Sequence, residues 1–125
     1  MDERRSGLTA EATAAIDEVT EDIAQGRSEK IYQEAAEEWR QSATPEQSKA
    51  ILDRVRNTLG KVESRSFVSG REQQNASGNL PDSTLIITYN TKFEHANGME
   101  TFTLIKRDGR WRLARYFVNS DALKQ

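Results

Sequence analysis

Apolar and polar positions follow two different periods along this chain, and the change between them divides it in two. Up to Gly60, apolar residues recur every three or four positions, which is the spacing of one face of an α-helix. After Gly60 they tend to alternate with polar residues, as in a β-strand with one buried face. The pattern therefore predicts a helical part over residues 8–60 and a sheet over residues 61–120.

Three helices are expected in the first part, because local start and stop sequences divide it. The first ends at Gly26, since glycine tolerates the left-handed conformation that commonly follows a last helical turn. Ser28 can cap the second helix. The third begins at the sequence TPEQ, with Thr44 as its cap, and ends at Gly60. The apolar stripes are Leu8, Ala12, Ile16, Val19 and Ile23, then Ile31, Ala35 and Trp39, then Ile51, Leu52, Val55 and Leu59.

Turn sequences divide the second part into four strands. Residues 61–69 form a weak first strand, and residues 70–83 are a polar loop rich in turn formers. Asn97-Gly98 and Asp108-Gly109 are typical of two-residue hairpin turns, in which both central residues need positive φ. We therefore expect an antiparallel sheet, and an α+β fold in which three N-terminal helices pack on it.

The two turns, taken as two-residue loops, also fix which side chains share a face of the sheet. One face collects Leu85, Ile87, Tyr89, Thr91, Phe93, Phe102, Leu104, Lys106, Trp111, Leu113, Arg115 and Phe117, and is expected to pack on the helices. The opposite face is rich in threonine but carries the apolar residues Ile86, Ile105, Tyr116 and Val118. These four residues are predicted to mediate self-association, with a homodimer as the partner state.

Length and charge restrict the function classes. At 125 residues the chain fits one domain, residues 1–125, with residues 1–7 as a flexible tail. The net charge is −2, and the basic run KRDGRWRLARYF places its cations at a turn and on different faces of the sheet. We therefore expect no nucleic-acid partner. There is no cysteine and one histidine, so neither a metal site nor a cofactor is predicted.

No window has the eighteen or so apolar residues of a membrane span, and the start MDERRSG lacks the apolar region of a signal peptide. As written, the chain is expected to be soluble. A trimmed native N-terminus would indicate an exported or periplasmic protein, and an intact one a cytoplasmic protein.

Three stretches carry a resemblance to known families: GRSEKIYQEAAEEWRQSATPEQ, RNTLGKVESR and ETFTLIKRDGRWRLARY. The layout resembles the nuclear-transport-factor-two-like superfamily, also called cystatin-like or SnoaL-like. Within it, the chain is most similar to a bacterial family of unknown function whose members are often exported or lipid-anchored. The resemblance spans about residues 8–120 and implies a cone-shaped fold, in which helices wrap the concave side of a curved sheet and a pocket opens between them.

Candidate chemistry centres on His95, the one side chain whose ordinary pKa lies near neutrality. The assumed register places it opposite Glu100 on the helix-facing side, with Arg115 diagonal to Glu100. The three could form a base, its orienting group and an anion clamp. The alternative, which we favour, is an exposed hairpin tip with a weak cross-strand charge pair.

Aromatic residues on the expected inner faces could line a pocket for a small apolar ligand, although packing explains them as well. The candidate pocket residues are Tyr32, Trp39, Tyr89, Trp111 and Arg115. Two functions follow from these observations. The first is a non-enzymatic ligand-binding or protein-interaction domain that self-associates through the outer sheet face. The second is a lyase or isomerase of the polyketide-cyclase or ketosteroid-isomerase type, with His95 or Glu100 as its base and Tyr89 or Tyr32 as its donor.

Overall fold

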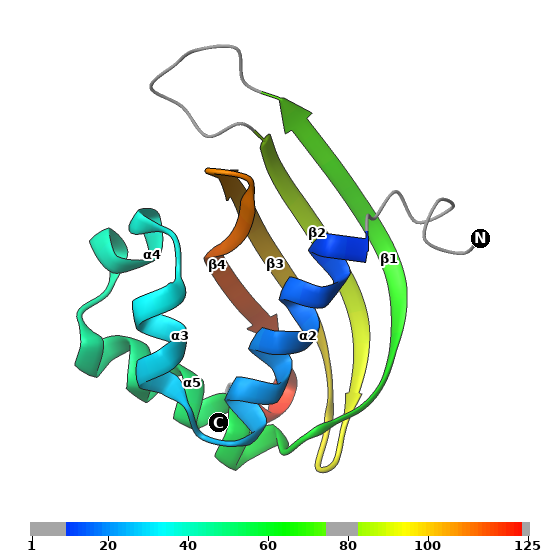
Figure 1. The fold of residues 1–125 in the computed structure, drawn as a ribbon. Coiled ribbons are helices and arrows are strands. Elements are labelled where there is room, and N and C mark those ends of the chain that lie inside the picture. The colour runs from blue at the N-terminus through cyan, green and yellow to red at the C-terminus, as the bar shows by residue number, and fades with distance from the viewer. Residues whose placement is uncertain (1–9, 75–82, 124–125) are drawn as a thin grey trace.

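The computed structural model describes residues 10–74 and 83–123. Helices gather on one side of a curved antiparallel sheet, and α2 runs across that side (Figure 1). The sheet has the order β1-β2-β3-β4, so each strand pairs with its neighbour in sequence. This arrangement confirms the α+β class. The elements are α2 (Ala10–Ala24), α3 (Ser28–Glu34), α4 (Glu37–Ser42), α5 (Pro45–Leu59), β1 (Val62–Gln74), β2 (Ser83–Phe93), β3 (Asn97–Arg107), β4 (Arg110–Asn119) and the 3-10 turn η1 (Asp121–Leu123).

The second expected helix is two helices, α3 and α4, separated by Ala35 and Ala36. Both alanines have extended backbone, with ψ angles of 164° and 158°. The N–H of Ala36 donates to the carbonyl of Leu113 in β4 at 2.8 Å, a bond that an uninterrupted helix could not make. The expected order of helices followed by a sheet is therefore observed, but the described residues form four helices, because a contact with the sheet divides the second one.

The start and end of α5 are as predicted. Thr44 accepts a hydrogen bond from the backbone N–H of Gln47, and the Gln47 side chain accepts one from the N–H of Thr44, which completes the capping box. Gly60 ends the helix with a φ of 85°. A Cβ at Gly60 would also lie 2.8 Å from the Glu94 side chain, so this position requires glycine for two reasons.

The first strand is longer than predicted. β1 continues to Gln74, so much of the stretch expected to be a polar loop pairs with β2. Two irregularities interrupt this pairing, between Val62 and Ser64 and between Phe67 and Ser69. The remainder of that expected loop up to residue 82 and the expected tail at residues 1–7 lie outside the described residues.

One of the two predicted turns is confirmed. Asp108 and Gly109 have φ angles of 57° and 77°, as a two-residue loop requires. The other prediction is wrong, because Asn97 and Gly98 begin β3 and residues 94–96 make the turn.

Long-range bonds hold the turn at residues 94–96. The N–H of His95 donates to the carbonyl of Leu59, and the N–H of Glu94 donates to the carbonyl of Lys61, both at 2.9 Å. The end of α5 thus fixes the turn, and a rule based on neighbouring residues could not include it. Because the resulting register shift is even, the inner and outer faces of β2 and β3 are as predicted. The partners differ: Tyr89 lies opposite Glu100, and Ile87 opposite Phe102.

A β-bulge reverses the second half of β4. Leu113 pairs with Leu104 as predicted, but Arg115 pairs with Thr103, so Ala114 is an extra residue. Beyond it, Tyr116 and Val118 turn inward and are buried, whereas Arg115 and Phe117 are exposed. The predicted placement of Arg115 and Phe117 on the inner face, and of Tyr116 and Val118 on the outer face, is therefore wrong.

The core fills the space between the helices and the inner face of the sheet. Its largest fully buried side chains are Phe102, Ile16, Leu52, Leu59, Leu85, Ile87 and Leu104. A smaller cluster joins Ile105 to Ala36 and Ala114 at the β4 side. Ile105, predicted to be available on the outer face, is therefore covered by the junction of α3 and α4.

Candidate functional site

A buried carboxylate lies on the inner face of the sheet. Glu100 of β3 is 1 % exposed. Its Oε1 accepts hydrogen bonds from Nε of Arg65 at 2.8 Å and from the Thr91 hydroxyl at 2.6 Å, and its Oε2 accepts one from the Tyr116 hydroxyl at 2.6 Å. These donors come from β1, β2 and β4, so one carboxylate joins all four strands.

Arg65 extends this network to the helices. Its second guanidinium nitrogen donates to the hydroxyl of Thr20 in α2 at 2.9 Å. The guanidinium also lies over the rings of Tyr89 and Phe102, at 5.3 and 5.2 Å from their centres. Both hydrogen bonds and ring contacts therefore compensate the charge that Arg65 brings beneath α2.

The network leaves no room for a substrate. The cavity bounded by Arg65, Glu100 and Tyr116 holds about 10 Å³, which is room for at most one water. Burial, reinforced by the charge of Glu100, raises the pKa of the Tyr116 phenol well above its ordinary value, so Tyr116 stays a proton donor to the carboxylate. The network therefore has a structural role, which we call a structural lock: its hydrogen bonds join the four strands to one another and to α2.

The three predicted catalytic residues are not brought together. His95 is exposed in the turn at residues 94–96, Glu100 is buried, and Arg115 is exposed on the other side of the sheet. The groups around Glu100 are Arg65, Thr91 and Tyr116. The register error and the bulge together explain why the predicted cluster is not assembled.

The predicted pocket residues are divided among separate hollows. Tyr32 lines a hollow of about 450 Å³ beside the start of α5, and its hydroxyl donates to the carbonyl of Ala43 at 3.0 Å. Trp111 lines one of about 60 Å³ under α2. Trp39 and Arg115 share a hollow of about 140 Å³ at the β4 edge. Tyr89 packs half-buried against Phe67 and Phe102.

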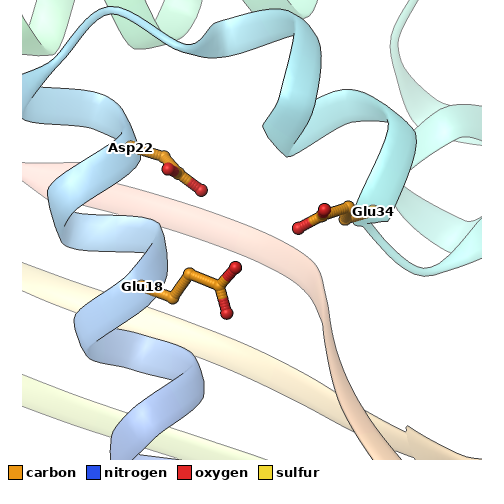
Figure 2. A group of neighbouring side chains, drawn as sticks. All are labelled: Glu18, Asp22 and Glu34. Carbon is orange, nitrogen blue, oxygen red and sulfur yellow. The ribbon is translucent and has the colours of Figure 1, made fainter.

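Three carboxylates among the described residues lie as close together as the ligands of a metal site. The carboxylates of Glu18, Asp22 and Glu34 point toward a common centre between α2 and α3 (Figure 2). The ammonium of Lys30 contacts all three, at 2.8, 2.7 and 3.2 Å respectively. These bonds, above all those to Asp22 and Glu18, raise the pKa of Lys30 above its ordinary value. The lysine thus supplies the positive charge, and the group ties α2 to α3.

The helices lie on one side of the sheet, and no described helix covers the outer face (Figure 1). Its middle row consists of Thr88, Thr101 and Phe117, aligned across β2, β3 and β4. Phe117 is 59 % exposed and Met99, in the next row, is 40 % exposed. We call this surface, bearing Ile86, Thr88, Asn90, Met99, Thr101, Thr103, Arg115 and Phe117, the outer face. Ile86 is the one residue of the predicted self-association set that contributes to it.

A shallow hollow of about 610 Å³ continues this face toward the turn at residues 94–96. Polar residues line most of it, among them Ser64, Asn90 and Asn119. Lys92 and Asp121 also line it, and Arg115 lies on the same face. The outer face therefore combines exposed apolar side chains with hydrogen-bonding groups, most of which are neutral.

Sequence reasoning missed the most highly connected group of the inner face. Glu100 was placed correctly on that face, but Arg65, Thr91 and Tyr116 were not joined to it. An inward glutamate among Phe102 and Leu104 indicates that a cation must lie nearby, because buried carboxylates need partners. That rule gives the need for a cation but does not say which residue supplies it.

Fold and site together define a small α+β domain whose inner sheet face is packed and hydrogen-bonded and whose outer sheet face is exposed. The chain belongs to the family described as protein of unknown function (DUF4019), whose model matches residues 15–116. The matched segment runs from α2 into β4 and includes Arg65, Thr91, Glu100 and Tyr116. No curated protein matches the chain. Within the described ranges, no helix is long and apolar enough to cross a membrane.

Proposed function

We infer that this domain is a protein-interaction module that forms a homodimer through its outer face. The observation that carries this proposal is the exposure of Phe117 beside a stretch of two central strands in which no outward position holds an ionisable residue; Lys92 and Arg107 lie at the ends of these strands. The outward positions of the stretch are Thr84, Ile86, Thr88 and Asn90 in β2, and Met99, Thr101 and Thr103 in β3. The centre of a protein interface is depleted in charge and enriched in aromatic residues and methionine, as this surface is.

The size of the face supports a second copy as the partner. Four strands spaced about 4.8 Å apart, each about ten residues long at ~3.3 Å per residue, present roughly 600 Å². Two such faces together bury roughly 1,200 Å², the lower end of the range for specific complexes. A weak dimer in the micromolar range is therefore expected. Sheets that pack face to face lie about 10 Å apart, and threonine-rich surfaces with few long side chains allow that approach.

A wider relationship to the nuclear-transport-factor-two-like superfamily is part of this proposal. Helices that lie against the inner side of a curved four-stranded sheet support it. The catalytic use of such a fold requires a cavity with an acid or base at its wall. Here the volume beside Glu100 is about 10 Å³, so the interaction module is the function that we propose.

Sedimentation equilibrium of the wild-type chain and of Phe117→Asp tests the proposal. A phenylalanine side chain buries about 200 Å², of which 59 % is exposed here; covering that part in a dimer contributes roughly 3 kcal/mol. We expect Phe117→Asp to weaken dimerisation by about a hundredfold or more.

Ile51→Asp is the matched control, because Ile51 is 46 % exposed on α5 in the helical layer. It should leave the dimer constant unchanged. A wild-type chain that is monomeric at about 500 µM, or a dimer that Ile51→Asp disrupts and Phe117→Asp does not, would overturn the proposal.

A further inference from the structure

The hollow at the β4 edge differs chemically from the other hollows of the described chain. It holds about 140 Å³ and lies between α4, α5 and the bulged part of β4. Trp39, Ala43, Ile51 and Tyr116 line it, and Arg115 is its one charged residue. An apolar space with a single cation at its wall is suited to a ligand that is apolar at one end and anionic at the other.

Arg115 is available for such a ligand. It is exposed, and no residue in the described ranges pairs with it by hydrogen bond or ion pair. The bulge at Ala114 places it here, since without the extra residue this position would face the core. Arg107 of β3, by contrast, has a counter-charge, because its guanidinium donates to both carboxylate oxygens of Glu38. Arg115 is therefore a cation without a counter-charge beside an apolar hollow.

The apolar wall is held in place independently of any ligand. The indole N–H of Trp39 donates to the hydroxyl of Ser48, which is fully buried, at 3.0 Å, and this bond fixes the ring. The hydroxyl of Tyr116 is fixed in the same way by Glu100. Ile51 stands 46 % exposed beside them, which leaves apolar surface that a ligand would cover. A preformed wall lowers the entropic cost of binding.

We propose that this hollow binds a small carboxylic acid with one ring or a short branched chain, whose carboxylate pairs with Arg115. Guanidinium donors match a carboxylate with two parallel N–H bonds, which an ammonium does not. The volume sets the size of the ligand, since a cavity of about 150 Å³ accommodates one benzene ring. Arg115 borders both this hollow and the outer face, but the hollow is formed within one chain, so this inference does not require dimerisation.

Titration of the ¹⁵N-labelled chain with benzoate, followed by the indole N–H resonance of Trp39, tests the proposal. Benzyl alcohol is the neutral probe of the same shape. For a ligand of nine heavy atoms in a partly open site, we expect a dissociation constant of about 1 mM for benzoate. Arg115→Gln should weaken benzoate five- to tenfold, and change benzyl alcohol by less than about twofold.

Two further variants complete the design. Ala43→Leu places a larger side chain in the hollow and should abolish binding of both probes. Arg71→Gln removes one positive charge from β1, at the opposite edge of the sheet, and should leave both constants unchanged. Repeating the titration in Phe117→Ser, which removes the ring from the proposed interface without placing a charge beside Arg115, separates this proposal from the proposed dimer, because the benzoate constant should be the same in that background.

Three results would overturn the proposal. The first is no movement of the Trp39 indole resonance at about 20 mM benzoate. The second is equal weakening of benzoate by Arg115→Gln and Arg71→Gln, which would indicate a nonspecific charge effect. The third is tighter binding of N-acetylphenylalanine than of benzoate, which would assign the hollow to the C-terminal residue of a peptide.

Discussion

Replacing Glu100 with glutamine tests the assignment of the buried network as a structural lock. The substitution preserves the shape of the side chain but removes its charge, and it leaves the Arg65 guanidinium beneath α2 without a counter-charge. One end of the new amide is also a donor, facing groups that all donate. Removing one partner of a buried ion pair costs about 3 to 5 kcal/mol.

The structure places this variant at the lower end of that range. The Arg65 side chain keeps 14 % of its surface exposed, so water can partly solvate the unpaired guanidinium. We therefore expect a loss of about 3 kcal/mol in the free energy of unfolding. For a chain of 125 residues, with an unfolding entropy of about 2.1 cal/mol/K per residue, that loss lowers Tm by about 11 °C.

Urea and thermal unfolding, followed by circular dichroism, measure the change. The matched control is Glu63→Gln, because Glu63 has the same chemistry but is 48 % exposed and 3.8 Å from Lys92. That variant should lose about 0.5 kcal/mol or less. A loss below about 1 kcal/mol for Glu100→Gln, or one equal to that of Glu63→Gln, would refute the assignment.

Three other predictions concern stability. The pKa of Tyr116 is raised in the folded state, so its phenol contributes stability that is complete below the unfolded pKa of about 10 and falls by about 1.4 kcal/mol per pH unit above it. In a plot of the free energy of unfolding against alkaline pH, Tyr116→Phe should lack that part of the slope. A slope equal to that of the wild-type chain would contradict the prediction. In urea melts, Gly60→Ala should lower the free energy of unfolding far more than Gly109→Ala. Both glycines have positive φ, but of the two only a Cβ at Gly60 would meet a neighbour, at 2.8 Å. Equal losses in the two variants would show that the steric contact is unimportant. Arg107 lowers the pKa of Glu38, so this pair should contribute about 0.5 kcal/mol of stability, which disappears as pH falls through the Glu38 pKa. The free energy of unfolding of Glu38→Gln and of the wild-type chain, measured against acid pH, tests this. Identical curves for the two chains would exclude the contribution.

The predictions from sequence succeeded where the determining contacts are local. The capping box at Thr44 and the loop at Asp108-Gly109 depend on residues within four positions of each other, and both are present. The turn between β2 and β3 depends on Leu59 and Lys61, about 35 residues away, and was misplaced. An Asn-Gly pair permits a tight turn but cannot outweigh bonds from another element.

The residues exposed on the outer side of the sheet were predicted less completely, for one physical reason. A single extra residue, Ala114, reverses every later side chain of β4, so Tyr116 and Val118 exchange faces with Arg115 and Phe117. No turn sequence marks that bulge. The contacts that accompany it, of Ala114 in a cluster with Ala36 and of Tyr116 with Glu100, join residues that are distant in sequence. The idea of an apolar outer face remains a proposal, now assigned to Phe117 and Met99.

Distance measurement between two copies tests the central proposal most directly. The chain has no cysteine, so a spin label can be attached at one position by Asn90→Cys, which lies exposed on the outer face. Since packed sheets lie about 10 Å apart, double electron–electron resonance should give intermolecular distances below about 25 Å for this label. A label at Asn57→Cys lies on α5, in the helical layer. A layer of helices about 10 Å thick then separates each label from the interface. The intermolecular distances should therefore be at least about 15 Å longer than those from Asn90. Short distances from Asn57, or distances from Asn90 that are no shorter than those from Asn57, would contradict an interface on the outer face.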